Sequence, residues 1–450
     1  MKAPIFDIGQ FLDECAFGKV QRRVLWICAL IGAAEGFDAQ AVSYIAPTLS
    51  ADWKLPPGAL GPVFSLGLFG LMLGALCVAP LADRVGRRPL LIGNLIIFGT
   101  GTLFTALAPN LTALMALRFL TGLGLGGAMP NAVSLTSEYM PSRRRGFLVM
   151  LMFNGFNAGS MLGGILSARF VGSLGWQAVF AAGGLLSLLL VPIVFFLLPE
   201  SAAFLALNAT SRERLIRILR RLDPSVRVDD GTLMYVARAP MAAKIAVRQL
   251  FAQGRGAMTL LIWTVFFLSL LDIYLLVSWL PTALNAGGAS VRNAIVAGIV
   301  LQLGSVVGCF PIGWALDRFG APVAMTCAYL GGGACIAAIG AFSGNLPLTL
   351  GIAFAAGFGL IGGQAAANAL AAMSYPTEVR STGVGWALGI GRIGSILGPL
   401  IGAGLLMAGI STAKLFMIVA IPAVLAGLAV AALGALGAGP LRRKLSQEPV

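Results

Sequence analysis

Five ionisable side chains lie inside long apolar stretches of this sequence: Glu35, Asp38, Arg118, Asp272 and Arg392. A charge in such a stretch is costly to bury unless it has a partner or faces a wet cavity, so residues of this kind mark pathways for ions, protons or charged ligands. Glu35 and Asp38 are three residues apart and would lie on one face of a helix. Two carboxyl groups at that spacing do not both ionise easily in a low dielectric. The pair is therefore a candidate proton carrier, with packing polarity as the structural alternative.

Proton chemistry in this chain must use carboxylates, because its 450 residues include no histidine. This excludes imidazole acid–base catalysis and histidine metal ligands. The six cysteines show no Cys-x-x-Cys spacing, and we interpret them as small core hydrophobes. Nucleophile motifs are absent from the sequence as well. We therefore expect no metal, no cofactor and no enzymatic activity.

Arg392 has the chemistry needed to bind an organic anion, since a guanidinium offers two parallel N–H donors to a carboxylate. The alternative is a structural ion pair between Arg392 and Asp272. Arg118 is predicted to compete for the first acidic pair and tune its proton affinity, or to be a structural partner. Candidate proton-coupling residues are thus Asp38, Glu35, Arg118 and Asp272. Polar and aromatic residues that could contact a substrate ring beside Arg392, or could simply belong to the core, are Phe37, Asn157, Tyr274, Gln302, Gln364, Asn368 and Trp386.

The composition places all these residues in a bilayer. Hydrophobic residues make up 58% and charged residues 11% of the chain, with a mean hydropathy of +0.91, which excludes a large water-soluble enzyme domain. The sequence predicts an all-α membrane protein with twelve spans. The predicted spans are 24–47, 59–81, 90–108, 111–135, 146–170, 177–198, 258–282, 292–315, 322–342, 347–372, 383–408 and 412–436.

The basic residues predict the orientation. Of the 31 Lys and Arg residues, 25 fall in alternate connections that begin with the N-terminal segment, so both termini are expected in the cytoplasm. The net charge of +14 then reflects topology and contact with the headgroups of the lipid bilayer, and we expect no nucleic-acid partner. The charged segment before the first span lacks a cleavage pattern, which predicts a retained span and no signal peptide.

The chain also repeats itself at an offset of 234 or 235 residues. Leu-Ala-Asp83-Arg84-Val-Gly86 aligns with Ala-Leu-Asp317-Arg318-Phe-Gly320, and Gly159-Ser-Met-Leu-Gly163 aligns with Gly394-Ser-Ile-Leu-Gly398. Such a repeat predicts two parallel halves with a substrate site between them near the midplane. The predicted divisions are a cytoplasmic N-terminal segment at 1–23, six-helix halves at 24–198 and 258–436, a cytoplasmic linker at 199–257 and a cytoplasmic tail at 437–450. The run that starts at Ser211 predicts a surface helix in the linker.

These motifs resemble those of the major facilitator superfamily. Its signature loop, Gly-x-x-x-Asp-Arg-x-Gly-Arg-Arg, reads Ala79-Pro-Leu-Ala-Asp83-Arg84-Val-Gly86-Arg87-Arg88 here, and only the leading glycine differs. Glu35-Gly36-Phe37-Asp38, Pro199-Glu200-Ser201 and Tyr375-Pro376-Thr377-Glu378-Val379-Arg380 are similar to the aromatic acid:proton symporter branch, which includes 4-hydroxybenzoate, protocatechuate, benzoate and hydroxyphenylpropionate carriers. The resemblance implies a twelve-helix major facilitator fold and proton-coupled import of a small aromatic carboxylate across a bacterial inner membrane.

The duplicated loops are predicted to act as cytoplasmic latches, with a topological basic loop as the alternative. Glycine permits the tight turn, and aspartate can accept hydrogen bonds from a helix N-terminus or an arginine. The predicted gating residues are Asp83, Arg84, Gly86, Arg87, Asp317, Arg318 and Gly320. We expect a monomer that rocks its two halves around the substrate. The functional alternatives are a proton symporter for a non-aromatic acid such as muconate or a dicarboxylate, an exporter, and a membrane sensor.

Overall fold

The computed structural model describes residues 5–15, 17–207, 212–223, 226, 233–235, 247–376 and 379–445, and most of them are helical. Apolar side chains cannot satisfy backbone polar groups, so a chain in lipid closes its own hydrogen bonds within helices. Within the described residues, ten of the helices are long and apolar enough to cross a membrane. The predicted all-α membrane architecture is confirmed.

The chain divides into two compact units, each described here by itself. Unit 1 contains Met1–Ala39, Leu66–Gly163 and Leu174–Met241. Its long helices are the first part of α2 (Lys19–Asp52), most of α3 (Gly61–Leu73), α5 (Arg87–Thr105), α6 (Leu111–Tyr139) and most of α7 (Arg145–Leu197). Its short elements are α1 (Ile8–Glu14), α4 (Ala82–Val85), α8 (Ala202–Leu207), α9 (Arg212–Leu222), η1 (Gly74–Val78), η2 (Ala79–Leu81), η3 (Ser142–Arg144), β1 (Ile5–Asp7) and β2 (Leu233–Tyr235).

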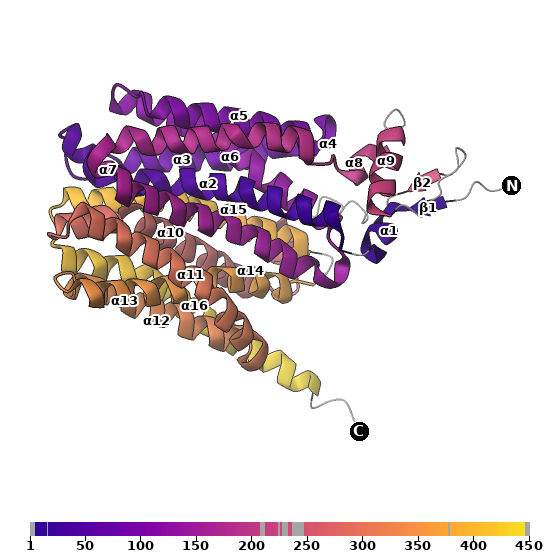
Figure 1. Cartoon of the computed structure of the whole chain (residues 1–450). Helices are drawn as coiled ribbons and strands as arrows, with labels where there is room; N and C mark the ends of the chain where they lie inside the picture. Colours follow the sequence, from indigo (N-terminus) through magenta and orange to yellow (C-terminus); the bar gives the residue numbers. More distant parts are fainter. Residues whose placement is uncertain are drawn as a thin grey trace. The chain divides into compact units, whose positions relative to one another are not determined.

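Unit 2 contains Gln40–Ser65, Gly164–Ser173 and Ala242–Val450, so it includes the ends of helices that begin in the first half of the sequence. Within it, α10 packs against α15 and α16, α12 packs against α16, and α11 packs against α13 (Figure 1). The elements of this unit that follow Ala242 are η5 (Val247–Leu250), α10 (Gly256–Ala286), α11 (Val291–Phe319), α12 (Ala321–Ala341), α13 (Leu346–Ala356), η6 (Gly357–Ile361), α14 (Gly362–Ser374), α15 (Arg380–Met407) and α16 (Thr412–Leu445).

Three predicted spans differ from the helices found. The spans predicted at 146–170 and 177–198 form one element, α7, which is interrupted only at Gly175, where φ is +77°. The span predicted at 90–108 corresponds to α5, which is helical but is not among the ten that meet the spanning criteria. Two arginines at its start and several glycine and threonine residues reduce the hydropathy of α5.

The sequence repeat is visible in the backbone. Gly86 and Gly320 each lie between two helices with a positive φ, +99° and +83°. A side chain is strained in that conformation, so glycine is required at both turns.

The repeat also extends to helix packing. In unit 1, a Cβ atom at Gly159 would lie 1.8 Å from the carbonyl oxygen of Ala33 on α2. In unit 2, a Cβ atom at Gly394 would lie 2.3 Å from the carbonyl oxygen of Phe267 on α10. Backbone therefore touches backbone where α7 crosses α2 and where α15 crosses α10.

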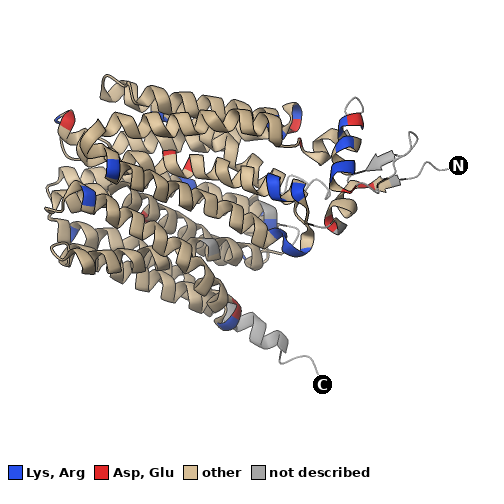
Figure 2. Ribbon diagram, in the orientation of Figure 1, with Lys and Arg blue, Asp and Glu red and all other residues tan. Residues whose placement is uncertain are grey.

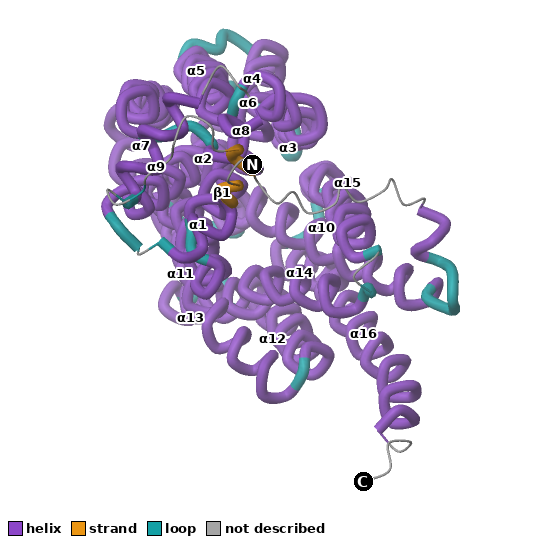
Figure 3. Tube along the Cα trace, turned by 90° about the vertical axis from the view of Figure 1, so that its right-hand side faces the viewer, coloured by secondary structure: helices purple, strands orange, loops and turns teal. Residues whose placement is uncertain are grey.

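Charged residues gather at the helix ends and on the short elements of unit 1 (Figure 2). There, β1 pairs in parallel with β2, with Ile5 opposite Leu233. The helix predicted from the run at Ser211 is present as α9, and it buries Leu215 and Leu219. Figure 3, which views this end, shows α1, β1 and α9 in front of the helices of unit 1.

Candidate functional site

A buried ion pair joins α2 and α6 inside unit 1. Nη1 of Arg118 lies 3.1 Å from Oδ1 and 3.0 Å from Oδ2 of Asp38. Only 4% of the arginine side chain and 3% of the aspartate side chain are exposed. The sequence predicted that Arg118 would compete for the first acidic pair, and the structure places Arg118 on Asp38.

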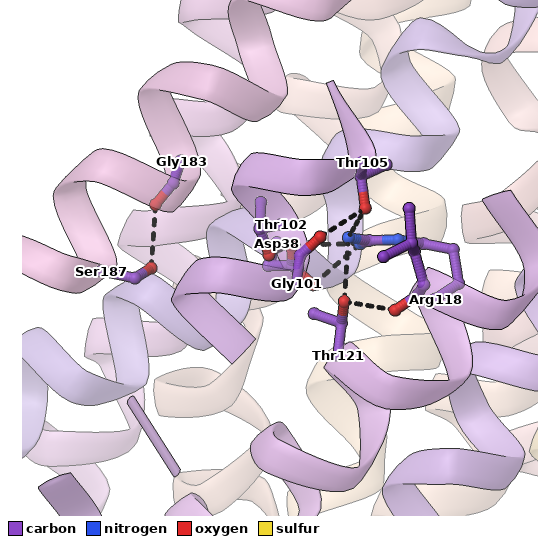
Figure 4. A network of polar contacts seen from close by, with 9 residues as sticks. Asp38, Gly101, Thr102, Thr105, Arg118, Thr121, Gly183 and Ser187 are labelled. Carbon is purple, nitrogen blue, oxygen red and sulfur yellow. Dashed lines mark hydrogen bonds and ion pairs between the residues drawn. The ribbon is translucent and has the colours of Figure 1, made fainter. Parts of the chain in front are cut away.

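Three threonines complete the polar shell of this pair (Figure 4). The hydroxyl of Thr102 on α5 donates to Oδ1 of Asp38. Nη2 of Arg118 donates to the hydroxyl oxygens of Thr105, at 2.8 Å, and of Thr121, at 3.1 Å. The guanidinium also lies 5.0 Å from the centroid of the Phe180 ring. Buried charges need partners of this kind, because an unsatisfied polar group in a low dielectric is costly.

Thr102, Thr105, Thr121 and Phe180 were not among the site residues predicted from the sequence. A signal for the first two exists, since Thr102 and Thr105 are three residues apart in a predicted span and would share a helix face. Threonines in membrane helices can also bond to their own backbone, as Thr105 does through the carbonyl of Gly101 at 2.8 Å. The spacing alone therefore does not separate the two roles.

Protonation of Asp38 would convert this ion pair into an uncompensated buried cation. Arg118 would then require another anion, and α2 and α6 would lose this ion pair.

The other residues predicted on the first span are also buried. Glu35 lies nearly one turn before Asp38 on α2 and is 5% exposed. The ring of Phe37 is 3% exposed and packs against Gly183 and Gly163 of α7. Phe37 thus contributes to the core of unit 1. Asn157, on α7, is half-buried in the same unit.

Arg392 in unit 2 lies on α15, half-buried, and its Nη1 is 3.5 Å from the hydroxyl of Tyr274 on α10. The structure thus brings together two of the predicted substrate residues. No ion pair joins Arg392 to Asp272 among the described residues, so the predicted alternative of a structural salt bridge between them is wrong. The reason is helical geometry, because Asp272 and Tyr274 are two residues apart and point roughly 200° away from each other.

Asp272 instead faces the interior of unit 2. It is 0% exposed, and neither carboxyl oxygen has a hydrogen-bond partner within bonding geometry. Its electrostatic neighbours are the backbone of Ala423 on α16 and the phenol of Tyr329 on α12, which is itself 0% exposed. Asp272 thus belongs to the buried interior of unit 2 and is not a partner of Arg392.

The remaining predicted substrate residues of unit 2 occupy different environments. Gln302 is buried on α11. Gln364 on α14 is half-buried, and its Oε1 is a buried acceptor without a donor. Asn368, one turn later, is exposed. Trp386 stacks on Trp263 with ring centroids 5.8 Å apart and an angle of 23° between the planes.

The first predicted latch is held by carboxylates from within unit 1. The guanidinium of Arg87 forms an ion pair with Glu138. Oε1 of Glu200 accepts hydrogen bonds from the backbone N–H groups of Arg87, at 2.9 Å, and Arg88, at 3.2 Å. Glu200 thus caps the N-terminus of α5, where a negative charge is favourable. The sequence predicted this acceptor role for Asp83, but none of the described hydrogen bonds reaches Asp83, and the acceptor in this structure is Glu200.

The second predicted latch is arranged differently. The guanidinium of Arg318 lies 5.4 Å from the ring centroid of Trp314 and 5.8 Å from that of Phe319, so its described contacts are with aromatic rings. Gly320 keeps the turn, as described above, and Asp317 precedes Arg318 in the last turn of α11. The two loops share a backbone path but not their side-chain partners.

Comparison with known proteins gives a consistent result. The sequence model of the Major Facilitator Superfamily matches residues 28–310 and 262–449. A gallate transporter of Pseudomonas putida is 42% identical over 433 residues, which cover 96% of each chain. The 4-hydroxybenzoate transporter PcaK of the same species is 39% identical over 94% of this chain and 95% of that protein.

Two solved structures share the fold. The xylose transporter XylE from E. coli, in a partially occluded inward open conformation, has a TM-score of 0.69 at 16% identity and covers 91% of this chain and 97% of that chain. A bacterial homolog of the human lysosomal transporter Spinster, in an inward-facing and occupied conformation, has a TM-score of 0.69 at 16% identity over 93% and 98% of the two chains.

Proposed function

Since the chain belongs to the major facilitator superfamily, we propose that it imports a small aromatic carboxylate together with protons across the bacterial inner membrane. It is a multi-pass membrane transporter and not an enzyme. The names of the relatives, a gallate transporter and 4-hydroxybenzoate transporters, favour a hydroxylated benzoate as substrate. Both termini would lie in the cytoplasm, and the transporter would act as a monomer.

The observation that carries proton coupling is the buried pair of Asp38 and Arg118. In the proposed cycle Asp38 takes a proton from the outside, leaves Arg118, and returns the proton on the inside. Glu35, close by on α2, would share or relay the proton. Asp272, whose side chain is fully buried in unit 2, would be a second proton carrier.

The substrate carboxylate would bind Arg392, with the Tyr274 hydroxyl as a second donor. Nη1 of Arg392 and the hydroxyl oxygen of Tyr274 are 3.5 Å apart, a long contact that leaves the guanidinium and the hydroxyl free to form further hydrogen bonds. Arginine suits this role because its planar guanidinium can donate two parallel N–H bonds to a carboxylate. Hydroxyl groups on the ring would bind amide side chains, and the buried Oε1 of Gln364 is an acceptor in need of such a donor. Asn157, Gln302 and Asn368 are the other candidates.

Alternating access is supported by contacts inside unit 2. The hydroxyl of Ser43 donates to the carbonyls of Val277, at 2.6 Å, and Ser278, at 3.1 Å. The hydroxyl of Ser65 donates to the carbonyl of Ile396 at 2.8 Å. These bonds join helices of the first half of the sequence to α10 and α15. Side chain to backbone bonds of this kind can break and re-form at low cost, as a transporter that opens at alternate ends requires.

The test is uptake of radiolabelled 4-hydroxybenzoate into proteoliposomes with and without an inward proton gradient. We expect accumulation with the gradient and its loss when a protonophore is added. Asp38→Asn should abolish accumulation but allow counterflow exchange, and Glu35→Gln should reduce accumulation. Asp52→Asn is the matched control, because Asp52 is exposed at the end of the same helix. Normal gradient-driven accumulation by Asp38→Asn would contradict the proposed coupling.

The same assay separates the alternatives. Competition by muconate or a dicarboxylate, but not by benzoates, would indicate a symporter for non-aromatic acids. Efflux driven by the opposite gradient would indicate an exporter, and binding without flux would indicate a sensor.

A further inference from the structure

Unit 1 contains a large cavity outside the ion-pair site, with a volume of about 1160 Å³. Its walls come from α1, from the end of α6, from the η3 turn and from α8. The turn is Ser142–Arg144, and Arg145 begins α7, so three consecutive arginines border the cavity where a long apolar helix starts. The proposed topology places this end of the protein at the cytoplasmic leaflet.

The acidic residues that border the cavity all have partners. Asp7 caps the first turn of α1 by accepting from the backbone N–H of Gly9 at 2.8 Å. Oδ1 of Asp13 lies 2.6 Å from Nη2 of Arg145. Glu138 is held by Arg87 and by the hydroxyl of Ser201, at 2.6 Å from Oε2. Asp13 and Glu138 are thus paired with arginines, whereas Asp7, among the described residues, is bonded only to backbone N–H groups of its own helix.

Arg143 and Arg144 are not compensated in this way. Both are exposed, and neither is in an ion pair among the residues that the structure describes. Among the described lining residues, these two guanidinium groups face a single carboxylate outside an ion pair, that of Asp7, so the remaining charge of the cavity is positive. Adjacent guanidinium groups favour a phosphate, because each can donate two parallel N–H bonds to its oxygens.

Other parts of the wall are apolar. Ile8 and Leu12 of α1 are buried behind it, and Phe17 is 37% exposed at its border. A wall that combines free arginines with apolar side chains at the end of a spanning helix suits an amphiphile better than a small inorganic ion. Basic pockets between membrane helices on the cytoplasmic side bind lipid headgroups by this chemistry.

We propose that this cavity is a binding site for the phosphate headgroup of an anionic phospholipid, with Arg143 and Arg144 as its ligands. The headgroup bridges the η3 turn and α1, and it thereby fixes the N-terminal helix against the end of α6. Binding itself does not depend on the proposed transport function, so the two can fail separately.

The experiment is native mass spectrometry of the purified full chain titrated with dihexanoyl phosphatidylglycerol, dihexanoyl phosphatidylcholine or inorganic phosphate. We expect saturable binding of phosphatidylglycerol, weakened at least about tenfold in the double variant Arg143→Gln/Arg144→Gln. The control is Arg220→Gln/Arg221→Gln on α9, which removes the same charge from residues that do not line the cavity. A thermal unfolding midpoint in detergent equal to that of wild type confirms that each variant is folded.

A second variant should strengthen the binding of phosphatidylglycerol. Asp13→Asn releases Arg145 from its ion pair and adds a third free guanidinium to the cavity, so phosphatidylglycerol should bind more tightly. Equal lipid binding by wild type and Arg143→Gln/Arg144→Gln would overturn the proposal, and so would an equal loss in the α9 control. Saturation by inorganic phosphate at the same concentrations would show that the ligand is free phosphate and would overturn the assignment to a lipid.

Discussion

The contribution of the buried Asp38–Arg118 ion pair to stability can be measured by replacing each partner. Asp38→Asn leaves Arg118 as a buried cation whose remaining partners are the hydroxyls of Thr105 and Thr121. Arg118→Gln leaves Asp38 as a buried anion that keeps the Thr102 hydroxyl. Each single change therefore breaks a buried ion pair and leaves one charge without its partner.

The size of the effect follows from burial. With only 4% and 3% of the two side chains exposed, solvent cannot screen the orphaned charge. Removal of one partner from such a pair costs about 3–5 kcal/mol, whereas removal of both restores a neutral interior. The double variant Asp38→Asn/Arg118→Gln should therefore be more stable than either single variant. The coupling free energy between the two positions should exceed about 3 kcal/mol.

The assay is a double-mutant cycle on thermal unfolding of the purified protein in detergent. The matched control is the ion pair of Asp13 and Arg145, which is shorter, at 2.6 Å, but has side chains 36% and 41% exposed. Its cycle should give about 1 kcal/mol or less, because exposed pairs contribute little. If the Asp38–Arg118 changes are additive, or if the exposed pair couples as strongly, the buried pair does not hold α2 to α6 and the proposed proton switch loses its physical basis.

Three further predictions test other groups. Asp272→Asn should keep the free energy of unfolding within about 1 kcal/mol of the wild-type value, since the amide has the same shape as the carboxyl group that it replaces, but it should lower gradient-driven accumulation. Normal accumulation would remove Asp272 from the proton pathway. Arg392→Lys should weaken equilibrium binding of 4-hydroxybenzoate by about 1–3 kcal/mol and Arg392→Ala by more, and equal affinities in all three proteins would place the anion site elsewhere. Glu200→Gln should slow transport without weakening substrate binding, because Glu200 caps α5, and it should slow transport more than Asp83→Asn does. The kcat of uptake measures the rate and the KM measures the binding. A loss of binding as large as the loss of rate would contradict the prediction.

Features set by local chemistry could be predicted from the sequence. Apolar length gives the helices, and the repeated Asp-Arg-x-Gly pattern correctly indicates turns at Gly86 and Gly320, where only glycine is free of strain. The ionisable residues in spans were also identified, because a buried charge is conspicuous in an apolar stretch. The boundary at Gly175 was located only as a gap between two spans, since a glycine with positive φ within a helical run looks like any other glycine.

Apart from the interaction of Arg118 with the first acidic pair, the partners of these residues could not be predicted, because they depend on which helix face meets which neighbour. Arg392 and Asp272 both fall near the middle of their spans, yet α10 turns Asp272 inward and Tyr274 toward Arg392. Thr102 and Thr105 are ordinary residues of an apolar helix until α6 places Arg118 beside them. The role of Glu200 likewise depends on the return of the chain after α7 to the start of α5.

The glycine contacts between α2 and α7 have a mechanical consequence. A Cβ atom would lie 1.8 Å from a carbonyl oxygen at Gly159, 1.9 Å at Gly36 and 2.2 Å at Gly155, so each glycine seats a carbonyl of the opposite helix. Axial sliding by less than a full turn, about 5.4 Å, would drive those carbonyls into side chains. The two helices are thus interlocked by these contacts. Helices α10 and α15 interlock in the same way at Gly394 and at Gly398, where a Cβ atom would lie 2.5 Å from the carbonyl oxygen of Leu271. A displacement of α2 that begins at Asp38 must therefore carry with it the part of α7 before Gly175. Each of the two helix pairs moves as one rigid body, without sliding of one helix along the other.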